Sequence, residues 1–144
     1  MVSERSEIMD DYRYALSNAP GTQELLTIIS GGTPERRSDL LRAHWELAEE
    51  AGWRVVTCTG GPEALLTLTA SLVEPGPVAL LLEEVELRGL EALRSIAVAV
   101  QHEIRKDREI SLVLSGENAL ITPLLTDGAA TFMQRALYID LNRD

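Results

Sequence analysis

The chain has 144 residues, a formal net charge of −10, and a composition that is 45% hydrophobic and 25% charged, which together predict one globular domain with its own core. The acidic balance argues against nucleic acid and anionic membranes as direct partners and favours basic partners. The single cysteine, Cys58, excludes an internal disulfide, and without a signal-like segment or a long apolar run we expect a cytoplasmic protein in which Cys58 is plain core.

Short apolar runs alternate with amphipathic segments along the chain. Residues 1–20 are polar and predict an N-terminal arm with a short helix over residues 10–17. Apolar runs bounded by turn residues predict strands, and apolar residues at three- and four-residue steps predict helices. In chain order, we expect a strand at 25–29, a helix at 38–51, a strand at 53–58, a helix at 62–73, a strand at 78–82, a helix at 87–106, a strand at 110–114, short helical pieces at 118–134 and a strand at 136–141.

This alternation predicts an α/β fold over residues 1–144, with three layers and a five-stranded parallel sheet. Strands that are apolar on both faces, such as residues 78–82, are typical of central parallel strands.

The loop after the first predicted strand carries part of a phosphate-binding motif. A P-loop reads G-x-x-x-x-G-K-[ST] between a strand and a helix, and the chain has GGTPERRS at residues 31–38. Gly31 and Ser38 keep the spacing of the first glycine and the terminal hydroxyl. Arg36 puts a side chain where the backbone must turn toward phosphate, and Arg37 replaces the compact lysine with a bulkier, forked cation. An ordinary polar loop is the plainer interpretation of this motif alone.

Two later strands end in polar residues that suit the same chemistry. Glu83 and Glu84 follow the third strand, where P-loop ATPases place a metal-organising carboxylate and then one that polarises water. Ser115 ends the fourth strand, where a polar residue senses the terminal phosphate. Because ligands bind at the carboxyl ends of parallel strands, we expect the carboxylates near Ser38 and paired with one loop arginine. A solvated strand end is the plainer interpretation of the acidic pair.

The sequence as a whole resembles the AAA-type P-loop ATPase domains of actinobacterial ATP-binding proteins, which are related to the origin-recognition and STAND-type group. The resemblance covers residues 22–141. Its best-matching stretches are residues 25–41, 80–85, 96–102 and 112–141. It implies that the first strand is central, between the fourth and the fifth, with the third beyond the fourth and the second at the edge.

The resemblance also implies roles for individual residues. Glu84 would be the catalytic carboxylate, and Arg135 would reach the nucleotide of a neighbouring subunit. Ser38 and Glu83 would hold Mg²⁺. The residues that would bind ATP are Gly31, Arg37, Ser38 and Ser115. The chain departs from the family at the glycine–lysine pair and at the glutamate in place of the metal-organising aspartate, and it ends where the family's helical lid begins.

These departures weaken the expectation of ATP and Mg²⁺ as cofactors. We expect a degenerate AAA-type ATPase-like domain with weak or no nucleotide binding and no turnover. Its role would be that of a binding or regulatory module. Its partner would be a protein, or the missing lid or effector domain. An oligomer is possible. One alternative is an active ATPase in which Arg37 replaces the P-loop lysine. The other is an acidic protein-interaction module unrelated to nucleotide.

Overall fold

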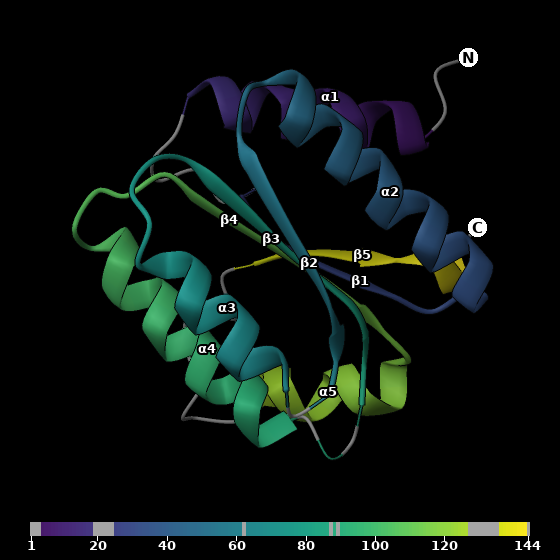
Figure 1. The fold of residues 1–144 in the computed structure, drawn as a ribbon. Coiled ribbons are helices and arrows are strands. Elements are labelled where there is room, and N and C mark those ends of the chain that lie inside the picture. Colours follow the sequence, from purple (N-terminus) through teal and green to yellow (C-terminus); the bar gives the residue numbers. More distant parts are fainter. Residues whose placement is uncertain are drawn as a thin grey trace.

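The chain folds around a five-stranded parallel sheet with helices on both faces (Figure 1). This computed structural model describes residues 4–18, 25–61, 63–86, 88, 90–126 and 136–143. The elements are α1 (Glu4–Ser17), β1 (Leu26–Ser30), α2 (Pro34–Glu50), β2 (Arg54–Gly60), α3 (Ala64–Leu72), β3 (Val78–Val85), α4 (Leu90–Ile104), β4 (Ile110–Gly116), α5 (Asn118–Thr126), β5 (Leu137–Asp140) and the 3-10 helix η4 (Leu141–Arg143).

The strand order is β2-β3-β4-β1-β5, which confirms the order expected from the sequence. Every neighbouring pair is parallel, so the carboxyl ends of all five strands lie at one edge of the sheet. All seven residues of β4 are buried, as befits a strand covered on both faces.

Two cores lie on the two faces of the sheet. One is formed with α3, α4 and α5, and the other with α1 and α2. Cys58 is half-buried and packs against the first core, and burial raises the pKa of its thiol to about 11. The predicted core role of Cys58 therefore holds at the edge of that core, where the thiol stays protonated and unreactive.

Helix α2 begins at Pro34, four residues before the predicted start at residue 38. Thr33 adopts an extended conformation and its side chain accepts a hydrogen bond from the backbone N–H of Arg36 at 3.2 Å. Proline in the first turn needs no N–H donor, so Thr33 and Pro34 together start the helix early. The consequence is that Arg36, Arg37 and Ser38 belong to the helix and not to a loop.

Other boundaries differ by a few residues. β3 continues through the acidic pair to Val85, and β4 continues to Gly116. The predicted helical pieces over 118–134 begin as the single helix α5, and residues 127–135 lie outside the described part of the chain. Within the described ranges, no helix has the length and apolarity needed to cross a membrane.

Candidate functional site

A tight glycine turn connects β1 to α2 at the carboxyl end of the sheet. Gly31 and Gly32 have φ angles of 79° and 63°, in the left-handed region that favours glycine. A β-carbon on Gly31 would lie 2.7 Å from the Asn142 side chain, so the turn is also packed closely against the segment after β5. Only residues 31–33 separate β1 from α2.

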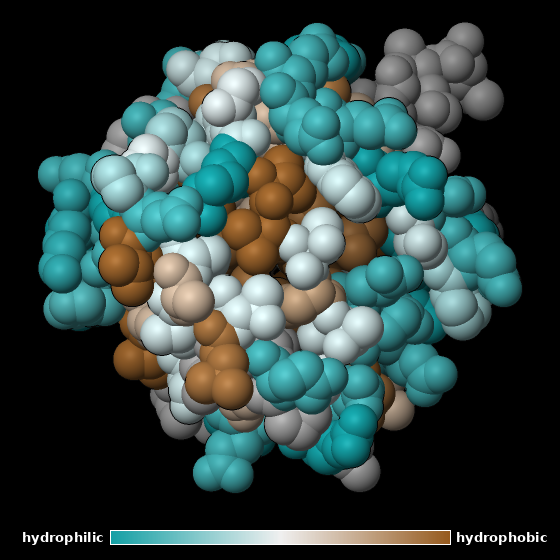
Figure 2. All heavy atoms as spheres, in the orientation of Figure 1, coloured by the Kyte–Doolittle hydropathy of each residue, from teal (hydrophilic) through white to brown (hydrophobic). Residues whose placement is uncertain are grey.

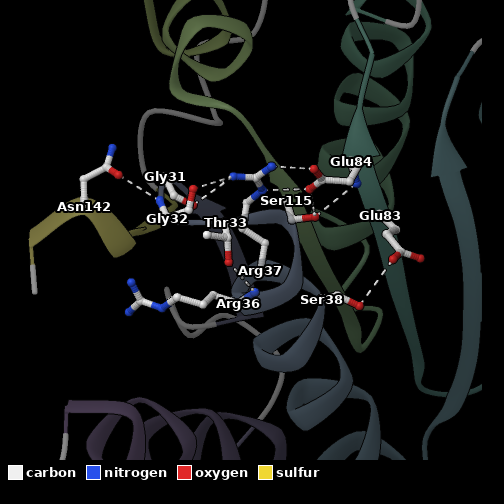
Figure 3. A network of polar contacts seen from close by, with 10 residues as sticks. All are labelled: Gly31, Gly32, Thr33, Arg36, Arg37, Ser38, Glu83, Glu84, Ser115 and Asn142. Atoms are coloured by element: carbon white, nitrogen blue, oxygen red, sulfur yellow. Dashed lines mark hydrogen bonds and ion pairs between the residues drawn. The ribbon is translucent and has the colours of Figure 1, made fainter.

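Arg37 turns from the first turn of α2 back toward the sheet. Its Nε and Nη2 atoms donate to the two carboxylate oxygens of Glu84 at 2.9 and 2.6 Å. Its Nη1 atom donates to the carbonyl of Gly31 at 2.9 Å and to that of Gly32 at 3.4 Å. Figure 3 shows the guanidinium lying between the glycine turn and Glu84. The expected pairing of a loop arginine with the acidic pair is confirmed, and the partners are Arg37 and Glu84.

Glu84 is held in an unusual backbone conformation by Ser115. Its φ angle is 54°, which is uncommon for a residue with a β-carbon. The register between β2 and β3 shifts at this point. The buried Ser115 hydroxyl accepts the backbone N–H of Glu84 at 3.0 Å and donates to its carboxylate at 3.2 Å. The distortion of β3 therefore aims the Glu84 carboxylate at Arg37, and we call Arg37, Glu84 and Ser115 the clamp.

The two charged members of the clamp stabilise each other's ionised forms. Only 3% of the Arg37 side chain is exposed, against 38% of the Glu84 side chain. Hydrogen bonding to Glu84 raises the pKa of the Arg37 guanidinium, and hydrogen bonding to Arg37 lowers the pKa of the Glu84 carboxyl. The ion pair is therefore fixed in its charged state, with the bidentate geometry that makes such pairs strong.

Ser38 and Glu83, the predicted metal pair, lie side by side outside the clamp. The Ser38 hydroxyl donates to a Glu83 carboxylate oxygen at 3.4 Å, which is a long contact. Glu83 is exposed and points away from Glu84 in Figure 3. Among the described residues, no group of three or more His, Cys, Asp or Glu side chains is placed to hold a metal ion. Arg135, the predicted arginine for a neighbouring nucleotide, lies outside the described residues.

The segment after β5 covers the other side of the glycine turn. The Asn142 side-chain oxygen accepts the N–H of Gly32 at 2.8 Å, and Arg36 donates to the carbonyl of Leu141 at 3.2 Å. The Ser30 hydroxyl donates a hydrogen bond to the hydroxyl oxygen of Tyr138 on β5, at 2.6 Å. These contacts were not anticipated from the sequence, because only the parallel pairing of β1 with β5 brings residues more than 100 positions apart to one place.

The arrangement differs chemically from a site that is open to phosphate. A P-loop cradles phosphate with backbone N–H groups and a free cation. Here Thr33 and Asn142 accept two of the N–H groups at the turn. The cation, Arg37, is bound to Glu84 and to the Gly31 carbonyl. These residues are therefore hydrogen-bonded to one another, and they would have to rearrange before they could fit Mg²⁺ and a triphosphate.

Comparison with known proteins bears on the fold. No family model matches this sequence, and a search of the curated proteins finds no match. Among solved structures, the chain is similar to C. elegans PCH-2, an AAA+ ATPase, with a TM-score of 0.57 and 17% sequence identity. The match covers 94% of this chain but 40% of the PCH-2 chain. The comparison and the sheet topology together give this chain an AAA-like, P-loop NTPase-like fold.

Proposed function

We propose that the chain is a degenerate AAA-type ATPase-like domain, which binds nucleotide weakly or not at all and works as a non-hydrolysing binding or regulatory module. The observation that carries the proposal is the bidentate pairing of Arg37 with Glu84, combined with the bond from Arg37 to the Gly31 carbonyl. The side chain in the P-loop lysine position and the side chain in the catalytic glutamate position neutralise each other.

Opening the clamp has an energetic cost that a nucleotide must offset. Separating a buried ion pair costs about 3–5 kcal/mol, and the partial exposure of Glu84 reduces this to about 1–3 kcal/mol. A cost of this size lowers nucleotide affinity by roughly 5- to 150-fold before any contact is made.

The shortness of the glycine turn supports the same proposal. A P-loop motif has four residues between its glycines, whereas here α2 begins three residues after Gly31 and its first turn is already capped by Thr33. The helix N-terminus still favours anions in general. Weak binding of phosphate-containing molecules is therefore compatible with the proposal. The precise positioning that phosphoryl transfer needs is not compatible with it.

The partner in this proposal is a protein or a further domain that supplies a lid or effector function. The chain spans 40% of the PCH-2 chain, so a longer assembly around such a core has a structural precedent. The formal net charge of −10 favours a basic protein partner over nucleic acid or an anionic membrane. A cytoplasmic location and a place among actinobacterial ATP-binding proteins belong to the same proposal, which leaves the oligomeric state open.

The test combines calorimetric titration of Mg-ATP and Mg-ADP with an assay of phosphate release. We expect no turnover above background and a Kd weaker than about 100 μM, or roughly −5.5 kcal/mol. Glu84→Gln and the neighbouring Glu83→Gln serve as matched variants, because only Glu84 belongs to the clamp. Robust hydrolysis by the parent that is abolished by Glu84→Gln would contradict the proposal and favour an active ATPase that uses Arg37 as its cation.

A further inference from the structure

β2 is an edge strand whose outer side is open in the described structure. It pairs with β3 alone, so alternate backbone N–H and C=O groups point away from the sheet. Its sequence, RVVTCTG, is rich in β-branched residues and lacks the proline or lysine that often blocks an edge. Arg54, its one charged residue, turns toward α3 and donates to the Ser71 carbonyl at 2.7 Å. In Figure 1, β2 lies nearest the viewer, between α2 and α3.

A small pocket lies beside this edge, on the α2 face of the sheet. It has a volume of about 120 Å³ and combines buried apolar residues with polar ones. Its lining residues are Ser38, Leu41, Arg42, Trp45, Thr57, Leu81 and Glu83. Trp45 is 39% exposed, which is a large fraction for an aromatic residue next to an open strand. Figure 2, drawn in the orientation of Figure 1, shows hydrophobic side chains at the surface near the centre of the view, where β2 lies in Figure 1.

A strand added to β2 would use both features. Its backbone would satisfy the open N–H and C=O groups, and every second side chain would point toward the α2 face, where the pocket lies next to Thr57. Backbone pairing supplies affinity in this recognition mode, and the pocket supplies specificity.

Charge around the edge selects the kind of strand. A second surface hollow on α2 is lined by Trp45, one guanidinium and three carboxylates. The charged residues are Arg42, Glu46, Glu49 and Glu50. The exposed Glu83 carboxylate lies at the first pocket. Carboxylates beside an exposed indole favour lysine or arginine, by charge and by cation–π contact. A second copy of this chain would bring the same carboxylates and be repelled.

We propose that the open edge of β2, together with Trp45 and the carboxylates of α2, binds an extended segment of a partner protein that carries lysine or arginine side chains. The proposal rests on the proposed function, because it gives the binding module its docking surface. It uses residues outside the clamp, so the two can be tested separately.

The experiment measures fluorescence anisotropy of two dye-labelled peptides of about seven residues, a typical strand length. In one peptide lysine alternates with valine and threonine, and in the other glutamate replaces lysine. We expect the basic peptide to bind at least about tenfold more tightly than the acidic one, with affinity falling as salt rises. Hydrogen exchange of the β2 amides should slow when the basic peptide is bound.

Two double charge reversals distinguish an effect of this surface from an effect of the chain's net charge. Glu46→Lys combined with Glu49→Lys should weaken binding of the basic peptide at least about fivefold. Glu7→Lys with Glu91→Lys changes the net charge equally at exposed positions of α1 and α4 and should change binding by less than about twofold. Equal losses in both pairs, or binding without protection of the β2 amides, would overturn the proposal. Self-association of the chain through β2, measured by sedimentation, would also overturn it in favour of a second copy.

The nucleotide assays keep the two proposals apart. If neither peptide binds and the parent does not hydrolyse ATP, the docking surface is wrong and the proposed degenerate domain stands. If the parent hydrolyses ATP, the proposed function is wrong whatever the peptides do.

Discussion

The two buried serines of β4 stand at opposite ends of the sheet, and each anchors a polar network on the face that α1 and α2 cover. At the amino end, the Tyr12 hydroxyl lies 2.7 Å from the Ser111 hydroxyl, which donates to the Leu25 carbonyl at 3.0 Å. The His44 ring meets the Tyr12 ring edge-on, with centroids 4.5 Å apart. At the carboxyl end, Ser115 serves the clamp. One network is neutral and fully buried, and the other is ionised and half-open to solvent.

The degree of burial explains why the network at the amino end is neutral and the one at the carboxyl end is ionised. Burial raises the pKa of Tyr12 to about 12 and lowers that of His44 to about 4, so both side chains are neutral near pH 7. In the clamp, hydrogen bonds between opposite charges outweigh burial, and both groups stay charged. The amino end therefore holds α1 and α2 to the sheet without ions, whereas at the carboxyl end the opposite charges of Arg37 and Glu84 bind each other.

Breaking the clamp from the Glu84 side should have the largest effect on stability. Glu84→Ala leaves the Arg37 cation buried with only carbonyl partners, and we expect a loss of about 2–3 kcal/mol in the free energy of unfolding. Arg37→Met should cost less, about 1–2 kcal/mol, because the freed Glu84 carboxylate can reach water. Urea denaturation at neutral pH measures both. Glu83→Ala is the matched control and should stay within about 0.5 kcal/mol. Equal losses for Glu83→Ala and Glu84→Ala would contradict the clamp.

Acid should weaken the amino end before the clamp. The pKa of His44 is about 4 in the folded state and near 6.5 when unfolded. Its neutral form therefore stabilises the fold above pH 6.5, and this stability is lost as the pH falls toward 4, by about 2 kcal/mol. The pKa of Glu84 is lowered, so the clamp persists until the pH falls below the ordinary carboxyl range. His44→Gln should remove the pH dependence of the unfolding free energy between pH 6.5 and 4.5, and exposed His102→Gln should not.

The two ends were also unequally predictable from the sequence. Apolar runs such as residues 78–82 were enough to predict the alternating elements and the parallel sheet, whereas the strand order came from the family resemblance. The polar residues after the strands predicted that one loop arginine would pair with the acidic pair, and the structure shows that the partners are Arg37 and Glu84. The early start of α2 was signalled by Thr33 and Pro34, but the P-loop template assigned those residues to a loop. The amino-end network was not predicted, because Tyr12 and Ser111 lie 99 positions apart and only tertiary packing joins them. Nor does any local pattern announce a left-handed φ at Glu84, which depends on Ser115 in the next strand.

Removing the serines one at a time should sharpen the contrast. Ser111→Ala removes the partner of the buried Tyr12 hydroxyl and a donor to the Leu25 carbonyl, and we expect a loss of about 1–2 kcal/mol. Ser115→Ala should cost about 1 kcal/mol, because the carboxylate of Glu84 keeps Arg37 and can reach water. Thermal and urea unfolding measure both. Tyr12→Phe combined with Ser111→Ala should cost less than the sum of the single changes. An additive double change would show that the two hydroxyls do not depend on each other.

The smallest effect should come from Asn142→Ala at the glycine turn. The variant removes the acceptor of the Gly32 N–H, but Gly32 is exposed, so water can replace the lost hydrogen bond. We therefore expect a loss of less than about 0.5 kcal/mol in unfolding free energy, together with hydrogen exchange of the Gly32 amide that is faster by about tenfold or more.

Gly31→Ala tests how closely the turn packs against Asn142, because a β-carbon on residue 31 would lie 2.7 Å from the Asn142 side chain. Gly31→Ala should destabilise the parent more than it destabilises the Asn142→Ala variant. The part of the penalty that persists in that variant combines the strain of a left-handed φ at residue 31 with the close approach of its β-carbon to Asp140 Oδ1, at 2.9 Å. A stability loss above about 1 kcal/mol for Asn142→Ala alone would instead make the segment after β5 a structural support of the turn, as indispensable at the carboxyl end as Ser111 is at the amino end.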